Sequence, residues 1–145
     1  MKAVIQRVKK ANVKIKGKII AEINKGFLVL LAVKQEDTEK DIQWVADKIL
    51  NLRVFSDEQE KMNLCILDIK GELLIVSQFT LYGDCKKGRR PNFVKAAAPE
   101  KAENFYNLFI SEIKKSGLKT ETGEFGAMMD IELINDGPVT IILES

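Results

Sequence analysis

The order of hydrophobic and polar positions predicts a chain made mostly of strands. Segments that alternate in polarity, or that are continuously apolar, are the expected strands; they lie at residues 2–7, 13–16, 19–21, 27–33, 64–69, 73–81, 128–134 and 139–143. Gly17 predicts the turn of a hairpin between the second and third segments. Asn135–Pro138 predicts a turn that reverses the chain between the last two.

Two segments repeat their apolar residues at helical spacing. The first covers residues 38–52 and begins with Thr38–Asp41, which has the form of a capping box. The second opens with Pro99 in its first turn and is closed by Gly117. Strands interrupted by two amphipathic helices predict an α+β fold, with one domain over residues 1–145 and a mainly antiparallel or mixed sheet.

Polar residues follow directly on a buried strand in the middle of the chain. Ser77, Gln78 and Thr80 come after the apolar run that ends at Val76. An unpaired polar group at such a place costs ~1–3 kcal/mol, so these side chains need partners. They either bond the neighbouring backbone or form a ligand site at the end of the strand, and their position alone leaves both interpretations open.

The composition narrows the chemistry. The 145 residues include no histidine, which removes the usual general base and every Ser-His or Cys-His pair. Cys65 and Cys85 lie far apart and do not form a zinc site or a disulfide framework, so we expect no metal or cofactor. No apolar run is long enough to cross a bilayer, and no signal peptide is apparent, which indicates a cytoplasmic protein.

A basic loop follows the central strand. With a net charge of only +2, any attraction for nucleic acid must come from a local patch. Four basic residues between Asp84 and Phe93 could form it: Lys86, Lys87, Arg89 and Arg90. The loop is either a solvated surface loop or a contact for RNA phosphates.

Several segments together resemble the D-aminoacyl-tRNA deacylase family. The resemblance covers essentially the whole chain, in the order and spacing of the family, and is carried by Ile5–Val8, Phe55–Asn63, Ser77–Leu81, Lys87–Pro91 and Asn135–Thr140. Asn92 departs from the family, in which Ser is common at this position. Because Asn92 lies in the basic loop, the departure concerns only the contact with RNA.

The resemblance implies an enzyme of translation quality control. Its substrate would be tRNA that carries a D-amino acid, or glycine mischarged on a tRNA such as tRNA(Ala), and its reaction would be hydrolysis of the aminoacyl ester. The family is thought to work without a side-chain base, with the terminal ribose 2′-OH helping to activate water. Ser77 and Gln78 would belong to the catalytic segment, and the backbone N–H groups of Phe79 and Thr80 would stabilise the oxyanion. The Thr80 hydroxyl is either a nucleophile or a positioning group.

The resemblance also implies a homodimer with each active site at the subunit interface. Gly137 and Pro138 would form a cis dipeptide that enters the partner's pocket and holds the substrate amino group, so that an L side chain collides with the protein. Phe125 and Met129 would line the pocket for the terminal adenosine, although strand-end core is an alternative role. Arg7 would brace the active-site strand.

Two other functions remain possible from the sequence. A binding module could hold RNA through the basic loop and perform no chemistry. A serine hydrolase could use Ser77, but the sequence offers no base and no nucleophile-elbow pattern around it.

Overall fold

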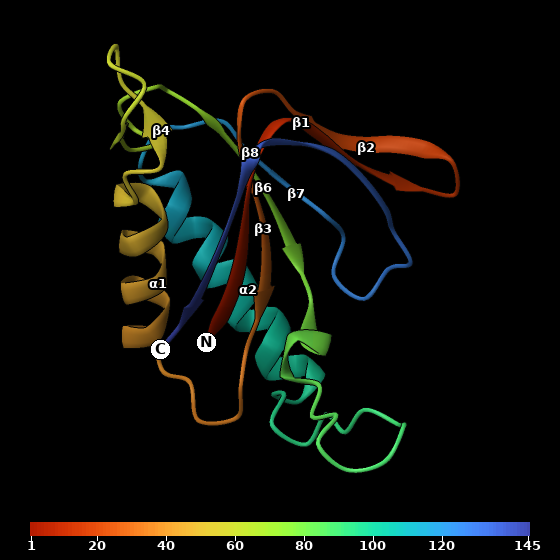
Figure 1. Ribbon diagram of the computed structural model, residues 1–145. Coiled ribbons are helices and arrows are strands. Elements are labelled where there is room, and N and C mark those ends of the chain that lie inside the picture. The colour runs from red at the N-terminus through yellow and green to blue at the C-terminus, as the bar shows by residue number, and fades with distance from the viewer.

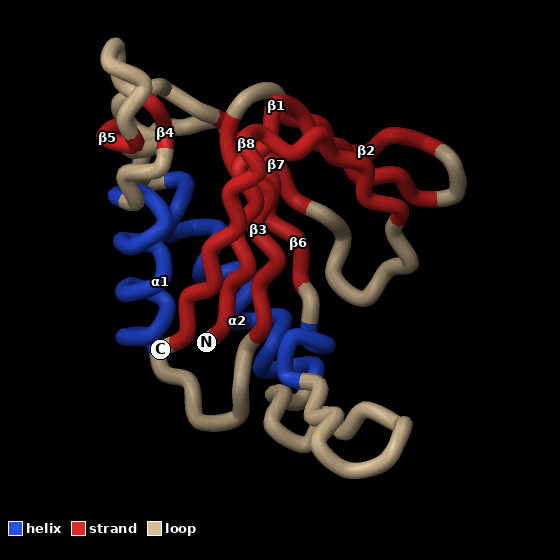
Figure 2. Tube along the Cα trace, in the orientation of Figure 1, coloured by secondary structure: helices blue, strands red, loops and turns tan.

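A six-stranded mixed sheet carries two helices on one face, as the computed structural model of residues 1–145 shows (Figures 1 and 2). In chain order the elements are β1 (Lys2–Ile15), β2 (Lys18–Ile23), β3 (Gly26–Ala32), α1 (Glu39–Asn51), β4 (Phe55–Ser56), β5 (Met62–Leu64), β6 (Glu72–Ser77), the 3-10 turn η1 (Phe79–Tyr82), α2 (Pro99–Lys114), β7 (Thr120–Thr122) and β8 (Asp130–Glu144). The predicted α+β class and mixed sheet are confirmed.

The sheet combines antiparallel and parallel pairing around the long strand β1. β1 pairs antiparallel with β2, β3 and β8, while β3, β6 and β7 lie parallel. The apolar side chains of β3 and β6 are buried on both faces, as their continuous apolar runs predict. One face packs on α1 and α2, and the hairpin of β1 and β2 projects away from the helices (Figure 1).

Both helices form where their spacing predicts them. α1 has Thr38 as its N-cap, and the expected capping box with Asp41 is present. α2 begins at Pro99 and buries one side, including Phe109, against the sheet. The N-terminal cap and the apolar stripe were readable because both depend on local spacing alone.

Two strand predictions are wrong in the middle of the chain. Residues 66–70 form turns instead of a strand, because the Asp68 carboxylate accepts a hydrogen bond from the Cys65 N–H at 2.8 Å and Gly71 N–H donates to Ile66 O at 3.0 Å. The central strand ends at Ser77 instead of Leu81, and the chain continues as η1.

The Asn135–Pro138 segment does not reverse the chain. β8 runs through it as one strand, and both of its halves pair with β1, from Lys14↔Asp130 to Lys2↔Glu144. The pairing slips between Val8↔Asn135 and Gln6↔Thr140, so the intervening residues of β8 bulge outward. The strands predicted on each side of this segment are present. The turn was wrongly predicted because the residue types that favour a chain reversal also favour a bulge.

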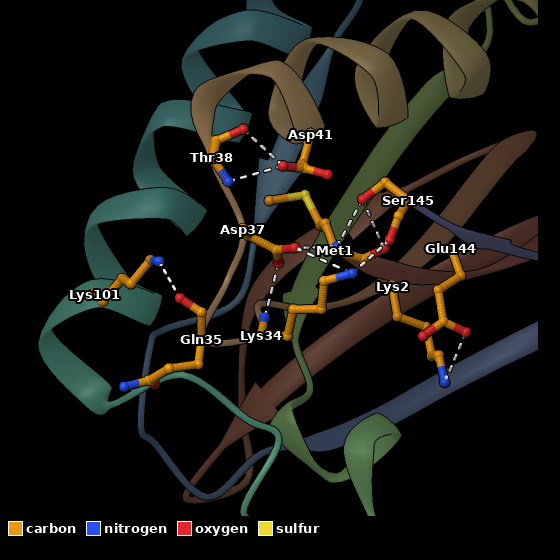
Figure 3. A network of polar contacts seen from close by, with 10 residues as sticks. All are labelled: Met1, Lys2, Lys34, Gln35, Asp37, Thr38, Asp41, Lys101, Glu144 and Ser145. Atoms are coloured by element: carbon orange, nitrogen blue, oxygen red, sulfur yellow. Dashed lines mark hydrogen bonds and ion pairs between the residues drawn. The ribbon is translucent and has the colours of Figure 1, made fainter.

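Met1 and Ser145 lie side by side at one end of the sheet (Figure 3). The N-terminal ammonium of Met1 pairs with the fully buried carboxylate of Asp37 and donates to Ser145 Oγ at 2.7 Å. Asp37 also accepts from the Lys34 N–H at 2.8 Å, which fixes the loop between β3 and α1.

None of the helices combines the length and the apolar character needed to span a membrane.

Candidate active site

A cavity of about 800 Å³ opens where β6 ends. Its walls come from η1, from the first turns of α2 and from the segment between β7 and β8. It brings together six residues that sequence analysis proposed for the site: Ser77, Gln78, Phe79, Thr80, Phe125 and Met129. These residues come from segments about fifty positions apart, and the parallel pairing of β6 with β7 places the segments next to each other.

The turn after β6 lines this cavity and contains two backbone donors without a partner. Gln78 N–H donates to Leu31 O at 2.7 Å, which ends the strand. Leu81 N–H then returns to Gln78 O at 3.2 Å, and Gly83 N–H to Thr80 O at 2.9 Å. The N–H groups of Phe79 and Thr80, between these bonds, donate to no acceptor in the chain. They are available to an oxygen atom of a bound molecule.

The polar side chains of this segment do not bond the backbone. Gln78 Nε2 donates to Thr80 Oγ1, which leaves the proton of the Thr80 hydroxyl free for another acceptor. The Ser77 hydroxyl has no partner in the chain, so the interpretation that these groups satisfy neighbouring backbone does not hold.

The cavity offers no side chain that titrates near neutral pH. Its lining contains no Asp, Glu, Lys, Arg or Cys, and fifteen of its twenty residues are hydrophobic. Burial raises the pKa of the Tyr106 hydroxyl, and this hydroxyl donates to Ile75 O at 2.7 Å. Tyr106 therefore stays protonated and braces β6, and Ser77 has no base with which to act as a nucleophile.

Two aromatic residues and a methionine that line the cavity were not predicted for the site: Tyr106, Phe93 and Met128. Tyr106 was interpreted only as core, although a tyrosine at a buried helical position signals a polar partner. Its ring lies 6.0 Å from that of Phe125. Phe93 and Met128 also line the cavity, and no sequence pattern marks them.

Met129 reaches the cavity because of a glycine. A Cβ built on Gly123 would lie 2.7 Å from Met129 Sδ, closer than real contacts allow. The missing side chain at this position therefore makes room for Met129 beside Val76.

Gly137 and Pro138 lie away from the cavity of their own chain. They are exposed on the bulge of β8, and the peptide bond between them is cis. Gly137 has φ +125°, and a Cβ there would lie 2.6 Å from Arg7 Nη2, so this position requires glycine. Strand spacing and residue rise put the bulge on the order of 20 Å from Ser77 across the sheet.

Arg7 holds this bulge. Its side chain is 11% exposed. Nε donates to Asp136 O at 2.9 Å and lies 3.5 Å from the Asp136 carboxylate, while Nη1 donates to Val54 O. The sequence predicts that Arg7 braces the active-site strand, but its contacts are to Asp136, beside Gly137, and to Val54.

The basic loop extends beyond η1 at the lower end of the molecule (Figure 1). Lys86, Lys87, Arg89 and Arg90 are exposed, and none of them takes part in an ion pair. The loop is therefore a concentrated positive charge next to the cavity.

The outer edge of β8 has no strand beside it, because β8 pairs only with β1. Apolar side chains of β8 are exposed, with Ile142 at 65% and Ile134 at 47%. A long free edge with exposed apolar groups is a surface that proteins normally cover.

Comparison with known proteins identifies the family. The model of the family described as D-Tyr-tRNA(Tyr) deacylase matches residues 4–144. The chain belongs to this family. The deacylase chain is 59% identical over 145 residues to a D-aminoacyl-tRNA deacylase of Desulfatibacillum aliphaticivorans, covering 100% of this chain and 99% of the relative. It is 55% identical to that of Brevibacillus brevis, with full coverage of both.

Solved structures share the deacylase fold. One described as c-Myc DNA Unwinding Element Binding Protein is 46% identical, with a TM-score of 0.94 and coverage of 100% and 99% of the two chains. A probable eukaryotic D-amino acid tRNA deacylase is 16% identical, with a TM-score of 0.86 and coverage of 98% and 97%, and supports the fold alone. The resemblance seen in the sequence is confirmed, and the protein is a hydrolase of the deacylase family.

Nowhere in this deacylase chain do three or more Cys, Asp or Glu side chains gather to hold a metal ion.

Proposed function

We propose that the protein hydrolyses the ester bond of D-aminoacyl-tRNA and releases the amino acid and the tRNA. The observation that carries the proposal is the pair of unused N–H groups of Phe79 and Thr80 in a cavity without a titrating base. Such a site suits an ester that is already activated and needs mainly stabilisation of the charge that develops on its carbonyl oxygen. Membership of the family supplies the substrate class.

In the proposed reaction the ester carbonyl oxygen accepts hydrogen bonds from Phe79 and Thr80. Water adds to the carbonyl carbon, the 2′-OH of the terminal ribose assists removal of its proton, and the ribose 3′-oxygen leaves with a proton. Each backbone donor contributes about 10²–10³ in rate, as single donors of this kind do. The Thr80 hydroxyl, which accepts from Gln78, positions the substrate and does not attack it, because no neighbouring group can take its proton.

The terminal adenosine occupies the apolar side of the cavity, against Phe125 and Met129. The tilted contact between Phe125 and Tyr106 supports this role, because it fixes one aromatic wall. The basic loop holds the RNA backbone, and its lack of ion-pair partners leaves its charges available to phosphates.

Selection against L substrates comes from Gly137 and Pro138 of a second subunit in a homodimer. Their exposure, their distance from their own cavity and the free edge of β8 support a role in a neighbouring copy. Their carbonyl groups hold the substrate amino group, so an L side chain meets the protein while D residues and glycine do not. Glycine mischarged on tRNA(Ala) is therefore also a substrate.

The deciding test compares D-tyrosyl-tRNA and L-tyrosyl-tRNA with the purified protein in the presence of a chelator. Rapid loss of the D ester alone is the expected result. Cleavage of neither ester faster than in buffer would contradict the enzyme and favour the RNA-binding module. In that case substitution of the four basic residues would abolish RNA binding, while changes at Thr80 would have no effect.

The shared site is tested by complementation. Thr80→Pro removes one N–H donor. Gly137→Val introduces a side chain that clashes with Arg7 and distorts the bulge of β8. Each variant should be inactive alone, while coexpressed subunits should regain activity, because the heterodimer contains one intact site. A 16.3 kDa monomer by light scattering, or no recovery in the mixture, would contradict a site built from two subunits.

A further inference from the structure

Phe93 contacts both ends of the η1 turn. Its ring meets that of Phe79 edge-on, with centroids 5.1 Å apart and an interplanar angle of 67°. At the other end of the turn, a Cβ built on Gly83 would lie 3.1 Å from Phe93 Cε1, so the ring packs directly on this glycine. Phe79 is 54% exposed, and Phe93 is its only aromatic neighbour. The position of the Phe93 ring therefore restrains the turn that carries the two backbone donors.

The same residue stands at the base of the basic loop. Asp84 N–H donates to Asn92 O at 2.7 Å, and Asn92 N–H donates to Asp84 O at 2.9 Å. Asp84 directly follows Gly83, and Asn92 directly precedes Phe93. Asp84 and Asn92 are therefore bonded to each other at the base of the loop. Their chain neighbours, Gly83 and Phe93, form one of the contacts that restrain η1.

The segment after Phe93 is fixed to the sheet. Ala96 N–H donates to Phe93 O at 3.0 Å, and Ala97 N–H donates to Val33 O at 2.9 Å, just beyond the end of β3. Phe93 therefore lies between a fixed support and the loop. A shift at the base of the loop changes where its ring presses on η1.

We propose that Phe93 is a positioning residue that aligns the N–H groups of Phe79 and Thr80, and that it couples them to the basic loop. RNA phosphates held by the loop set the Asp84–Asn92 base, and through Phe93 they stabilise the reactive geometry of the turn. The inference rests on the proposed deacylase function and adds a residue that links RNA contact to the chemical step.

The test uses two substrates and the full-length protein. D-tyrosyl-tRNA engages the loop, whereas the D-tyrosyl ester of adenosine carries no phosphate. Phe93→Ala should lower kcat about tenfold on both, because misaligned donors lose part of the stabilisation that each supplies. Phe93→Tyr keeps the aromatic edge, so its kcat should stay within about twofold of the wild-type value. Loss of a whole donor would lower kcat far more than this.

The coupling is measured by combining Phe93→Ala with the pair Arg89→Gln and Arg90→Gln. On the tRNA substrate the loop substitutions should raise KM and also lower kcat about fivefold, the lower end of usual coupling between sites. In the Phe93→Ala background they should still raise KM but leave kcat unchanged. On the adenosine ester they should change neither constant.

Phe105→Ala serves as the matched control, because Phe105 is a half-buried aromatic residue on α2 that does not line the cavity. Its kcat should equal that of the wild type. The proposal is overturned if Phe93→Ala changes KM alone, or if the loop substitutions lower kcat equally in both backgrounds. Wild-type protein that cleaves D-tyrosyl-tRNA in the same assay keeps the proposed function intact under either of those results.

Discussion

Replacement of Arg7 by lysine tests whether the bulge of β8 controls chiral selection. The guanidinium donates to two carbonyl groups, those of Asp136 and Val54, from a nearly buried position. A lysine ammonium is a compact point charge without the planar fork of arginine, so it can bond only one of the two carbonyl groups. In Arg7→Lys, either the Asp136 carbonyl or the Val54 carbonyl therefore loses its hydrogen bond to a charged group.

The expected loss follows from these contacts. A hydrogen bond to a charged group contributes ~1.5–3 kcal/mol, so the free energy of unfolding should fall by about 2 kcal/mol. If the same free energy, about 2 kcal/mol, is lost from the positioning of Gly137, the ratio of D to L hydrolysis should fall by about 30-fold. Each 1.36 kcal/mol corresponds to a factor of ten in rate. Urea unfolding gives the first quantity, and rates on D- and L-tyrosyl-tRNA give the second.

Arg53→Lys is the matched control. Arg53 also makes two hydrogen bonds, to Asn63 O and Asn63 Oδ1, each at 2.6 Å, but it is exposed. Its replacement should cost no more than about 0.5 kcal/mol and leave the D to L ratio unchanged. Equal losses for the two variants, or an unchanged ratio in Arg7→Lys, would refute the reasoning.

Three further substitutions probe the fold and the cavity. Asp37→Asn should destabilise the protein by about 3–5 kcal/mol in urea unfolding, because it leaves the N-terminal ammonium buried without a countercharge; a loss below 1 kcal/mol would contradict this. Hydrogen bonding, first from the Thr38 backbone, lowers the pKa of Asp41 to about 2, so its stabilisation is present above pH 4 and is lost as the pH falls toward 2. Asp41→Ala should accordingly cost about 1 kcal/mol at pH 7 and almost nothing at pH 2, and a pH-independent difference would disprove the assignment. Gly123→Ala should push Met129 into the cavity and raise KM for D-tyrosyl-tRNA about tenfold with little change in kcat, whereas an unchanged KM would exclude Met129 from the adenosine pocket.

Local spacing made much of the fold predictable. The capping box at Thr38, the proline at the start of α2 and the glycine turn after Ile15 each act within a few residues, and each formed as expected. The polar segment after Val76 stood out in the sequence because polar groups at the end of a buried strand demand a partner, and it lines the cavity.

The errors arose where long-range pairing overrides local pattern. Asn135–Pro138 has the composition of a turn, but β1 pairs with both of its flanks and converts it into a bulge. The Arg7 contacts depend on segments that are distant in sequence, and the contact of Phe93 with Phe79 depends on closure of the loop between them by Asp84 and Asn92. Neither arrangement follows from local spacing alone.

The pairing of β1 with β8 also bears on how the chain is made. The strand that begins at Lys2 has its longest pairing with the strand that ends at Glu144, so this contact joins segments more than a hundred residues apart. During synthesis on the ribosome β1 and β3 can pair early, but the opposite edge of β1 stays uncovered until the last strand emerges. Long sequence separation between pairing strands slows folding. The sheet of this enzyme is therefore complete only after β8 has been synthesised and has left the ribosome.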